Sequence, residues 1–286
     1  MKVKSWFSLV FSATILLSLA GYTTQAKVID SVTEDISQAR SREFSNSKGG
    51  DACNKLENVT DSTIAGRQAF LHWVARCGER SELAMKRTVL GNTYWYGWSI
   101  YIPPSWQDTS RGYDIVNQWL VYPAQIRFKE ACGAAGSYIA RSKDTLTFAF
   151  QRQGDTKEVV CTKYPLAKVA EMRGKWVDFV MHAKWTGNKD GHLKLWMKIG
   201  DEPYQLKVEH IGSTYWNHAK TGPYFKMGLY KGNPNFPGPA PRYLYTGGYR
   251  LGDATSNFQA VNPARELLTC RYAPKLSEML GLRCHN

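Results

Sequence analysis

The stretch Trp176–Ile199, WVDFVMHAKWTGNKDGHLKLWMKI, has the pattern of two β-strands joined by a tight turn. Apolar residues recur at every second position on both sides of the segment Thr186–Gly191, which is typical of strands with one buried face. The Gly-Asn and Asp-Gly pairs inside that segment favour a hairpin turn. We therefore expect antiparallel strands at Trp176–Trp185 and His192–Ile199.

A strand-like sequence pattern continues over most of the chain from Arg67 onward. Short runs of β-branched and aromatic residues are interrupted by Gly, Pro, Asn and Asp, as strands and turns require. The clearest further strands are Tyr94–Ile102, Thr145–Arg152 and Tyr224–Tyr230. Many short strands are typical of a sandwich, a jelly roll or a barrel. The sequence has no internal repeat, which argues against a solenoid or a propeller. Our prediction is an all-β protein with a β-jelly roll, a two-sheet antiparallel sandwich of the concanavalin A-like kind.

The two ends of the mature chain differ from this strand-rich body. Residues 27–56 are polar and rich in Ser, Asn and Gly, and we interpret them as a polar N-terminal arm. Residues 57–286 are expected to form one domain. Its tail contains two short predicted helices, Pro263–Cys270 and Lys275–Leu280, and Gly281 ends the second one.

Residues 1–26 have the features of a bacterial signal peptide. Lys2 and Lys4 precede an apolar run, Trp6–Leu19, which is shorter than the roughly 20 residues that a membrane-spanning helix needs. We expect cleavage after Ala26 and a protein that is secreted or periplasmic, without stable insertion in a membrane. The alternative is an uncleaved N-terminal anchor.

All six cysteines lie in the part of the chain that would be exported. An even number of cysteines in an oxidising compartment indicates disulfide bonds, and we expect three bridges between sequence neighbours. None of the spacings is a CxxC, which argues against a zinc site. The cysteines are Cys53, Cys77, Cys132, Cys161, Cys270 and Cys284.

The chain is strongly basic. Its formal net charge is +13, and removal of Lys2 and Lys4 with the signal peptide lowers it by two to +11. Such a field attracts polyanions, namely nucleic acid, an anionic membrane or an acidic polysaccharide. The basic residues are scattered and form no nucleic-acid-binding motif. For an exported protein we expect an acidic polysaccharide as the partner, no nucleic acid, and a monomer.

Three short segments carry residues suited to chemistry: Arg80–Leu83 (RSEL), Asn117–Trp119 (NQW) and Tyr224–Tyr230 (YFKMGLY). Strand alternation in the last segment predicts a core-facing set, Phe225, Met227 and Leu229, and an opposite polar face. That polar face carries a cation and two phenols, on Tyr224, Lys226 and Tyr230. Gly228, between Lys226 and Tyr230, leaves room for another group to approach this face closely.

RSEL, a Gln on a strand and YFKxGxY resemble, in this order, the three motifs of the jelly-roll alginate lyases. The run Tyr94–Pro103 (YWYGWSIYIP) and the stretch Trp176–Trp196 are similar to the heparin lyase I and glucuronan lyase group. The resemblance covers about residues 67–253. It implies a polysaccharide lyase of this jelly-roll group, with a concave sheet that forms a cleft and carries the catalytic residues.

A lyase of this kind removes the proton at C5 of a uronate and expels the 4-linked sugar. Because that proton is very weakly acidic, the enediolate needs donors that neutralise the carboxylate. Arg80 offers a planar fork for a carboxylate, and Gln118 donates through its amide without adding negative charge. By resemblance, Tyr230 matches the catalytic tyrosine and is the expected acid. Lys226, four residues away on the same strand face, is expected to lower the pKa of this phenol.

The sequence departs from the alginate lyase pattern at one position. Those enzymes usually place a His two residues after the motif Gln, whereas this chain has Leu120 there. Either Tyr230 serves as both base and acid, or another histidine fills the site. The first candidate for such a histidine is His182.

Further roles follow from neighbouring residues. Glu82 either binds substrate or orients Arg80, and Tyr224 and Lys226 are expected to bind substrate. No cofactor is required for the reaction, and no metal ligand is assigned. A structural calcium ion would find oxygen ligands on Asn188, Asp190 and Asp201, although turn formation explains these three residues equally well.

Two other functions compete with the lyase hypothesis. A non-catalytic, lectin-like glycan-binding protein uses the same sandwich and needs no acid or base. A jelly-roll glycoside hydrolase needs two carboxylates that flank the bond, and no predicted strand carries alternating acids. We therefore expect cleavage of a 4-linked, uronate-containing polysaccharide by β-elimination, which leaves an unsaturated uronate end. Glucuronan, heparin-like chains and alginate-like chains all remain open as substrates.

Overall fold

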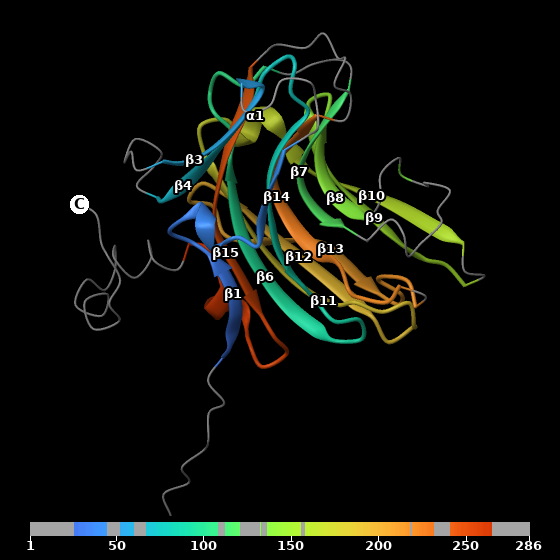
Figure 1. Ribbon diagram of the computed structural model, residues 1–286. Helices are drawn as coiled ribbons and strands as arrows, with labels where there is room; N and C mark the ends of the chain where they lie inside the picture. Colours follow the sequence, from blue (N-terminus) through green and yellow to red (C-terminus); the bar gives the residue numbers. More distant parts are fainter. Residues whose placement is uncertain are drawn as a thin grey trace, which may run out of the picture.

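The computed structural model describes residues 26–44, 52–59, 67–107, 112–120, 132, 136–155, 158–217, 219–231 and 241–264. Within these ranges the chain forms two antiparallel sheets that pack face to face (Figure 1). Helices are few and short: η1 (Ile36–Gln38), α1 (Val169–Met172) and α2 (Phe258–Val261). The prediction of an all-β jelly roll built from two antiparallel sheets is confirmed.

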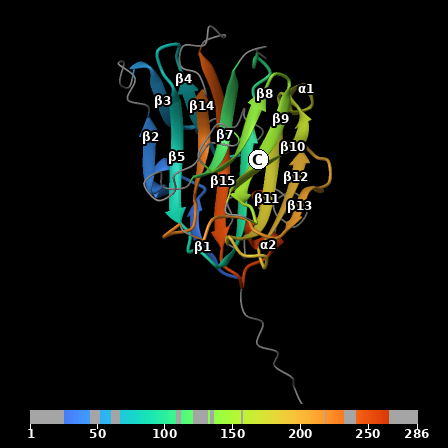
Figure 2. The same cartoon turned by 90° about the vertical axis from the view of Figure 1, so that its right-hand side faces the viewer.

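Both sheets interleave strands that are distant in sequence. Sheet A has the order β13 (Gln205–Ile211), β12 (His192–Ile199), β11 (Trp176–Lys184), β6 (Thr93–Tyr101), β15 (Arg242–Gly252), β4 (Ala69–Val74) and β3 (Asn54–Val59), and β1 (Val28–Val32) also pairs with β15. Sheet B has the order β10 (Val159–Lys168), β9 (Thr145–Gln153), β8 (Ser137–Ser142), β7 (Tyr113–Leu120), β14 (Tyr224–Lys231), β5 (Arg80–Arg87) and β2 (Ser41–Phe44). Figure 2 shows the strands of sheet B in front of those of sheet A.

An aromatic core fills the space between the sheets. Trp98 of sheet A stacks on Phe179 at a ring separation of 5.0 Å and packs against Trp119 of sheet B at 5.4 Å. Phe225 of sheet B lies 5.0 Å from Trp98 and 5.1 Å from Trp119. The Trp98 indole N–H donates to Asn117 Oδ1 across the sheets at 2.9 Å. Large rings in offset and edge contacts therefore fix how the two sheets pack.

The strands predicted from alternation coincide with β6, β9, β11, β12 and β14 to within one residue at each end. The predicted hairpin is present, because β11 and β12 pair antiparallel with Lys184 opposite His192. These strands are long and have one clearly apolar face, which is the condition under which a period of two is easiest to recognise.

The structure corrects the prediction of a polar N-terminal arm. Part of residues 27–56 belongs to the sheets: β1 pairs with β15, and β2 pairs with β5 at the edge of sheet B. Both strands are short, and most of their described side chains are exposed or half-buried, so they lack the apolar alternation of the inner strands. The boundary drawn at residue 57 therefore does not separate an arm from the sandwich.

Two of the predicted disulfides are present, Cys53–Cys77 and Cys132–Cys161, both between sequence neighbours. Cys270 and Cys284 lie outside the described residues, as do the predicted helix Lys275–Leu280 and most of Pro263–Cys270. Among the residues that are described, no helix is long and apolar enough to cross a membrane.

Candidate active site

The three sequence motifs meet on adjacent strands of sheet B. β14 lies between β5 and β7. Tyr230 on β14 pairs with Arg80 on β5, and Lys226 on β14 pairs with Gln118 on β7. Gly228 pairs with Glu82. Residues that pair across neighbouring strands point to the same side of a sheet, so these side chains share one face.

That face points away from the core, as the alternation on β14 predicts. Phe225, Met227 and Leu229 belong to the buried core between the sheets. Tyr224, Lys226 and Tyr230 therefore lie on the outer face of sheet B. Trp119, which neighbours Gln118 in sequence, is also part of the core.

Glu82 is the centre of a buried polar network on this face. Its side chain is 1% exposed, and the Gln118 amide N–H donates to Glu82 Oε1 at 2.5 Å. Lys226 Nζ lies 3.6 Å and Arg80 Nη1 lies 3.7 Å from Glu82 Oε2. A buried carboxylate is stable only with such partners. Glu82 thus connects Arg80 and Gln118, an arrangement that suits the orienting role, the second of the two roles considered for it.

Glu43 is a member of this network that sequence reasoning missed. It lies on β2, pairs with Glu82, and accepts a hydrogen bond from Lys226 Nζ. Lys226 is 1% exposed and contacts two carboxylates. Burial lowers the pKa of Lys226, but the charges of Glu82 and Glu43 outweigh burial, and the net shift is upward. Lys226 is therefore a charged structural link beneath the surface of this face.

Tyr230 contacts a different cation from the one expected. Arg80 Cζ lies 4.1 Å from the centroid of the Tyr230 ring, a typical cation–π distance. Burial raises the pKa of Tyr230, Arg80 opposes this shift, and the negative charge of Glu79 adds to it, with a net upward shift. The expectation that Lys226 lowers this pKa is thus corrected, because Lys226 is occupied by Glu43 and Glu82.

The glycine on β14, Gly228, is required for packing inside the protein. Gly228 has a φ of 144°, and a Cβ atom there would lie 2.3 Å from Ser81 O and 2.7 Å from His72 Nδ1. His72 is fully buried and also contacts Thr246 Oγ1 at 2.8 Å. Gly228 therefore allows β14 to approach β5 and His72 between the sheets. The close approach predicted at this position comes from the core side.

The structure does not bring His182 to this group. His182 lies on β11 of sheet A, where its ring stacks on Trp95 at 4.0 Å and lies 4.6 Å from His192. Its core-facing neighbours on β11 place it on the outer side of that sheet. Burial and the positive charges of His192 and Lys194 lower the pKa of His182 to about 4. The alternation of residues along a strand carries no information on which sheet holds the strand.

No described histidine lies on the outer face of sheet B. Leu120, at the position of the expected imidazole, pairs with Tyr224 on this face. His72 is enclosed between the sheets, and His192 and His210 lie on β12 and β13 of sheet A. His218 and His285 lie outside the described residues.

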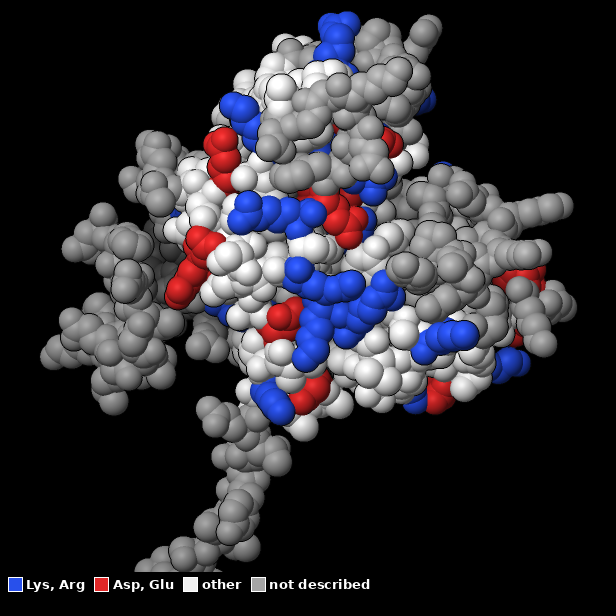
Figure 3. Space-filling model, in the orientation of Figure 1, with Lys and Arg blue, Asp and Glu red and all other residues white. Residues whose placement is uncertain are grey.

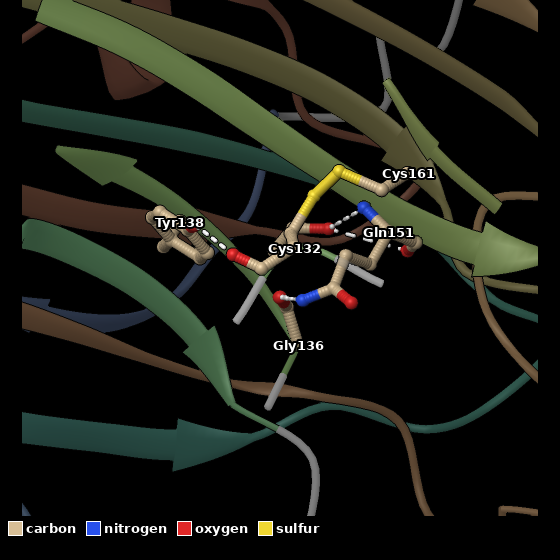
Figure 4. Close-up of a disulfide and its surroundings, with 6 residues drawn as sticks. Cys132, Gly136, Tyr138, Gln151 and Cys161 are labelled. Atoms are coloured by element: carbon tan, nitrogen blue, oxygen red, sulfur yellow. Dashed lines mark hydrogen bonds between the residues drawn. A yellow bond between two sulfur atoms is a disulfide. The ribbon is translucent and has the colours of Figure 1, made fainter. Parts of the chain in front are cut away.

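A small apolar patch adjoins Tyr230 on the same face. It consists of Ile115, Tyr138, Ala140 and Ala149, with Tyr113, Cys132 and Tyr230 packed against it. The Cys132–Cys161 disulfide holds one side of this patch, and the Tyr138 hydroxyl donates to Cys132 O at 2.7 Å (Figure 4). The Gln151 amide N–H donates to Gly136 O at 2.6 Å. The disulfide and these bonds fix the surroundings of the Tyr230 ring.

The predicted calcium ligands have other partners. Asp190 pairs with Lys184, and Asn188 Oδ1 accepts a hydrogen bond from Asn217 Nδ2 at 2.5 Å. Among the described residues, no group of three or more His, Cys, Asp or Glu side chains is arranged to hold a metal ion. Asn188 and Asp190 are thus already engaged in contacts within the protein.

Comparison with known proteins identifies the family. Residues 21–250 match the family model described as polysaccharide lyase. The chain belongs to this polysaccharide lyase family. None of the curated proteins matches the sequence.

Two solved structures share the fold of this polysaccharide lyase. The endo-β-1,4-glucuronan lyase of the fungus Trichoderma reesei superposes with a TM-score of 0.62 at 18% identity and covers 83% of this chain and 99% of its own. The marine family 14 alginate lyase from Aplysia kurodai gives a TM-score of 0.53 at 10% identity and covers 79% of this chain and 99% of its own. At such identities the likeness concerns the fold.

Proposed function

We propose that this polysaccharide lyase cleaves a 4-linked, uronate-containing acidic polysaccharide by β-elimination on the outer face of sheet B. The observation that carries the proposal is the contact of Arg80 with Tyr230, next to Gln118, on that face. Arg80 has a side chain that is 26% exposed, so its guanidinium is accessible to a ligand while it remains over the phenol ring.

Arg80 and Gln118 neutralise the substrate carboxylate. One N–H of the Gln118 amide is held by Glu82, and the amide has a second N–H for a ligand. The Arg80 guanidinium presents a planar fork that suits a carboxylate. Both donors are oriented before substrate binds, which stabilises the negative charge that develops on the enediolate.

Tyr230 acts as both base and acid in this proposal, because His182 lies on the other sheet and Leu120 replaces the usual imidazole. The Tyr230 phenolate accepts the C5 proton, and the electrons of that bond form the C4–C5 double bond. The C4–O4 bond breaks, and the leaving oxygen takes the proton back from the Tyr230 phenol. The raised pKa of Tyr230 makes its phenolate a stronger base for a weakly acidic C–H.

A single phenol imposes a stereochemical condition on the substrate. It reaches both the C5 hydrogen and the C4 oxygen only when they lie on the same side of the sugar ring. Glucuronate and mannuronate meet this condition, and guluronate has the opposite configuration at C5. We therefore expect glucuronan or mannuronate-rich chains as substrates and no cleavage within guluronate runs.

The test is the ultraviolet absorbance of the conjugated unsaturated uronate, measured on glucuronan, heparin, polymannuronate and polyguluronate. The wild type should produce the signal on a same-side polymer, and Tyr230→Phe should lose at least roughly a thousandfold in rate. Tyr243→Phe, a partly exposed tyrosine on sheet A, is the matched control and should keep full activity. Binding by wild type and Tyr230→Phe without product on any polymer would favour the lectin-like alternative.

Export from the cell is the second part of the proposal. The two disulfides of the described residues suit an oxidising compartment, and the predicted signal peptide supplies the route. Expression of the full chain in a bacterium tests this point. The mature protein should start at Lys27 in the periplasm or medium, and retention of the uncleaved chain in the membrane fraction would contradict it.

A further inference from the structure

Two arginines flank a tyrosine at the end of β14 opposite to Tyr230. Arg87 Cζ lies 4.7 Å and Arg40 Cζ 5.7 Å from the centroid of the Tyr224 ring. Tyr224 itself is 7% exposed, whereas Arg87 is half-buried and Arg40 is exposed. The ring thus supports two guanidinium groups that come from different strands, one at the end of β5 and one just before β2.

This arginine pair lies on the same face as Tyr230. Tyr224 pairs with Arg87 on β5 and with Leu120 on β7, and it shares its side of β14 with Lys226 and Tyr230. Tyr230 is six positions after Tyr224, and a strand rises about 3.3 Å per residue. The arginine pair therefore lies roughly 20 Å from the phenol, along the direction of the strand.

Within the described part of the chain, the side chains around Tyr224 include more cations than carboxylates. Three cations surround its ring, because Lys226 Nζ also lies 5.7 Å from the centroid. Two carboxylates, Glu43 and Glu82, are close enough to influence the phenol, and both contact Lys226. On the face of the molecule in Figure 3, Lys and Arg side chains gather near the middle, with Asp and Glu side chains beside them. Both carboxylates are thus bound to Lys226, and Arg87 Nη1 in addition donates to Thr221 Oγ1 at 3.4 Å.

We propose that Arg40 and Arg87, supported by Tyr224, form a second anion-binding subsite for a carboxylate of the same glycan chain, several sugars from the bond that is cleaved. The inference rests on the proposed function, because it assumes that the chain lies along β14. A polyuronate carries a carboxylate on every sugar, so an extended chain with one carboxylate at Arg80 presents another at this distance. A planar guanidinium held against a ring is pre-organised for such a group.

Contacts far from the reacting bond increase the affinity of the enzyme for chains long enough to reach them. The subsite contacts the substrate equally before and during the elimination, and uniform binding of this kind lowers KM without changing kcat. A chain too short to reach Arg87 from Tyr230 gains nothing. The subsite therefore makes the enzyme favour long polymers with closely spaced charges over short oligosaccharides and sparsely charged chains.

The experiment compares KM and kcat on long and short oligomers of the polymer that the wild type cleaves. The double variant Arg40→Ala/Arg87→Ala should raise KM for the long chain by roughly tenfold or more, with kcat unchanged and no effect on the short chain. The single variant Arg87→Lys should bind the long chain more tightly than the double alanine variant but less tightly than wild type. Lys55→Ala is the control, because Lys55 lies over Trp73 on sheet A at 5.3 Å in a comparable contact. Thermal unfolding confirms that each variant is folded.

Two results would overturn the subsite: an unchanged KM for the long chain, or an equal increase for long and short chains. Failure of the proposed function has a different signature, because the wild type then yields no elimination product at all. In that case direct binding of glucuronan and polymannuronate is measured by calorimetry, and loss of roughly tenfold in affinity in the double variant still supports the subsite. Equal affinity of wild type and double variant refutes it.

Discussion

Tyr230 on β14 lies directly opposite Arg80 on β5, with the Arg80 guanidinium 4.1 Å from the centre of the Tyr230 ring. This relationship places a permanent cation over the phenol proposed to carry the proton. It also leaves Lys226 to a separate role, in which it joins Glu43 and Glu82 beneath the surface. The two cations of the site thus have different surroundings: Arg80 lies over the phenol ring, and Lys226 is enclosed by two carboxylates.

The pH dependence of the reaction tests the role of Tyr230 as base. Its pKa lies above the ordinary value near 10, so the phenolate is a minor form at neutral pH, and its fraction grows as pH rises. We expect kcat/KM to increase about tenfold per pH unit from neutral toward the raised pKa. Loss of the Arg80 charge in Arg80→Gln should move this curve to higher pH. A rate that falls as pH rises would mean that Tyr230 acts only as an acid.

The buried charge network predicts a large loss of stability. Lys226→Met leaves Glu82, which is 1% exposed, without its closest cation, and such a change costs roughly 3–5 kcal/mol in the free energy of unfolding. Urea denaturation measures this value. Adding Glu82→Gln to Lys226→Met should restore part of it, because the uncompensated charge is then removed. A loss below about 1 kcal/mol, as at an exposed ion pair, would contradict the network.

His72 predicts a stability change in mild acid. Burial lowers its pKa from 6.5 to about 4, so between these values the unfolded chain binds a proton that the folded chain does not. Stability is therefore full above pH 6.5 and falls as pH decreases toward 4, by about 3 kcal/mol for this residue. His72→Asn, whose amide N–H replaces the Nδ1 donor to Ser81 O, should flatten this dependence in urea unfolding at several pH values. An unchanged slope would show that His72 does not cause it.

The disulfide beside the apolar patch predicts a loss of both stability and activity. Cys132 and Cys161 are 29 residues apart, and removal of such a bridge costs about 3–4 kcal/mol in the chain-entropy model. Because Cys132 and Tyr230 pack against the same patch, the double Ser variant should also lower kcat by roughly ten- to a hundredfold. The Cys53–Cys77 pair, 24 residues apart, is the control. Its removal should destabilise the protein similarly while kcat is retained.

Sequence alone predicted the parts of the site that depend on local periodicity. Alternation over Tyr224–Tyr230 gave the correct face for each side chain, because one face of β14 is wholly apolar. It could not place His182, since the same period of two applies to strands of either sheet. The order of strands within each sheet depends on long-range pairing that no local pattern encodes.

The charge partners were also beyond local prediction. Lys226 contacts Glu43, which precedes it by 183 residues, and Glu43 lies on a four-residue edge strand that has no clear alternation of its own. Because β2 lies among polar residues, the sequence there suggested an arm outside the sheets. The contact of Arg80 with Tyr230 follows from the pairing of β5 with β14, which motif order alone does not specify.

The mass of the oligosaccharide products tests the central claim most directly. Cleavage by β-elimination adds no water, so each internal product should weigh one water less than the corresponding product of hydrolysis. We expect the internal products that wild type makes from glucuronan or polymannuronate to be dehydrated in this way, and Tyr230→Phe to give almost none of them. The one fragment of each chain that keeps the original non-reducing end has the full mass in either reaction. Internal products with the full mass of hydrolysis would contradict the account, because they would show that the enzyme adds water across the bond.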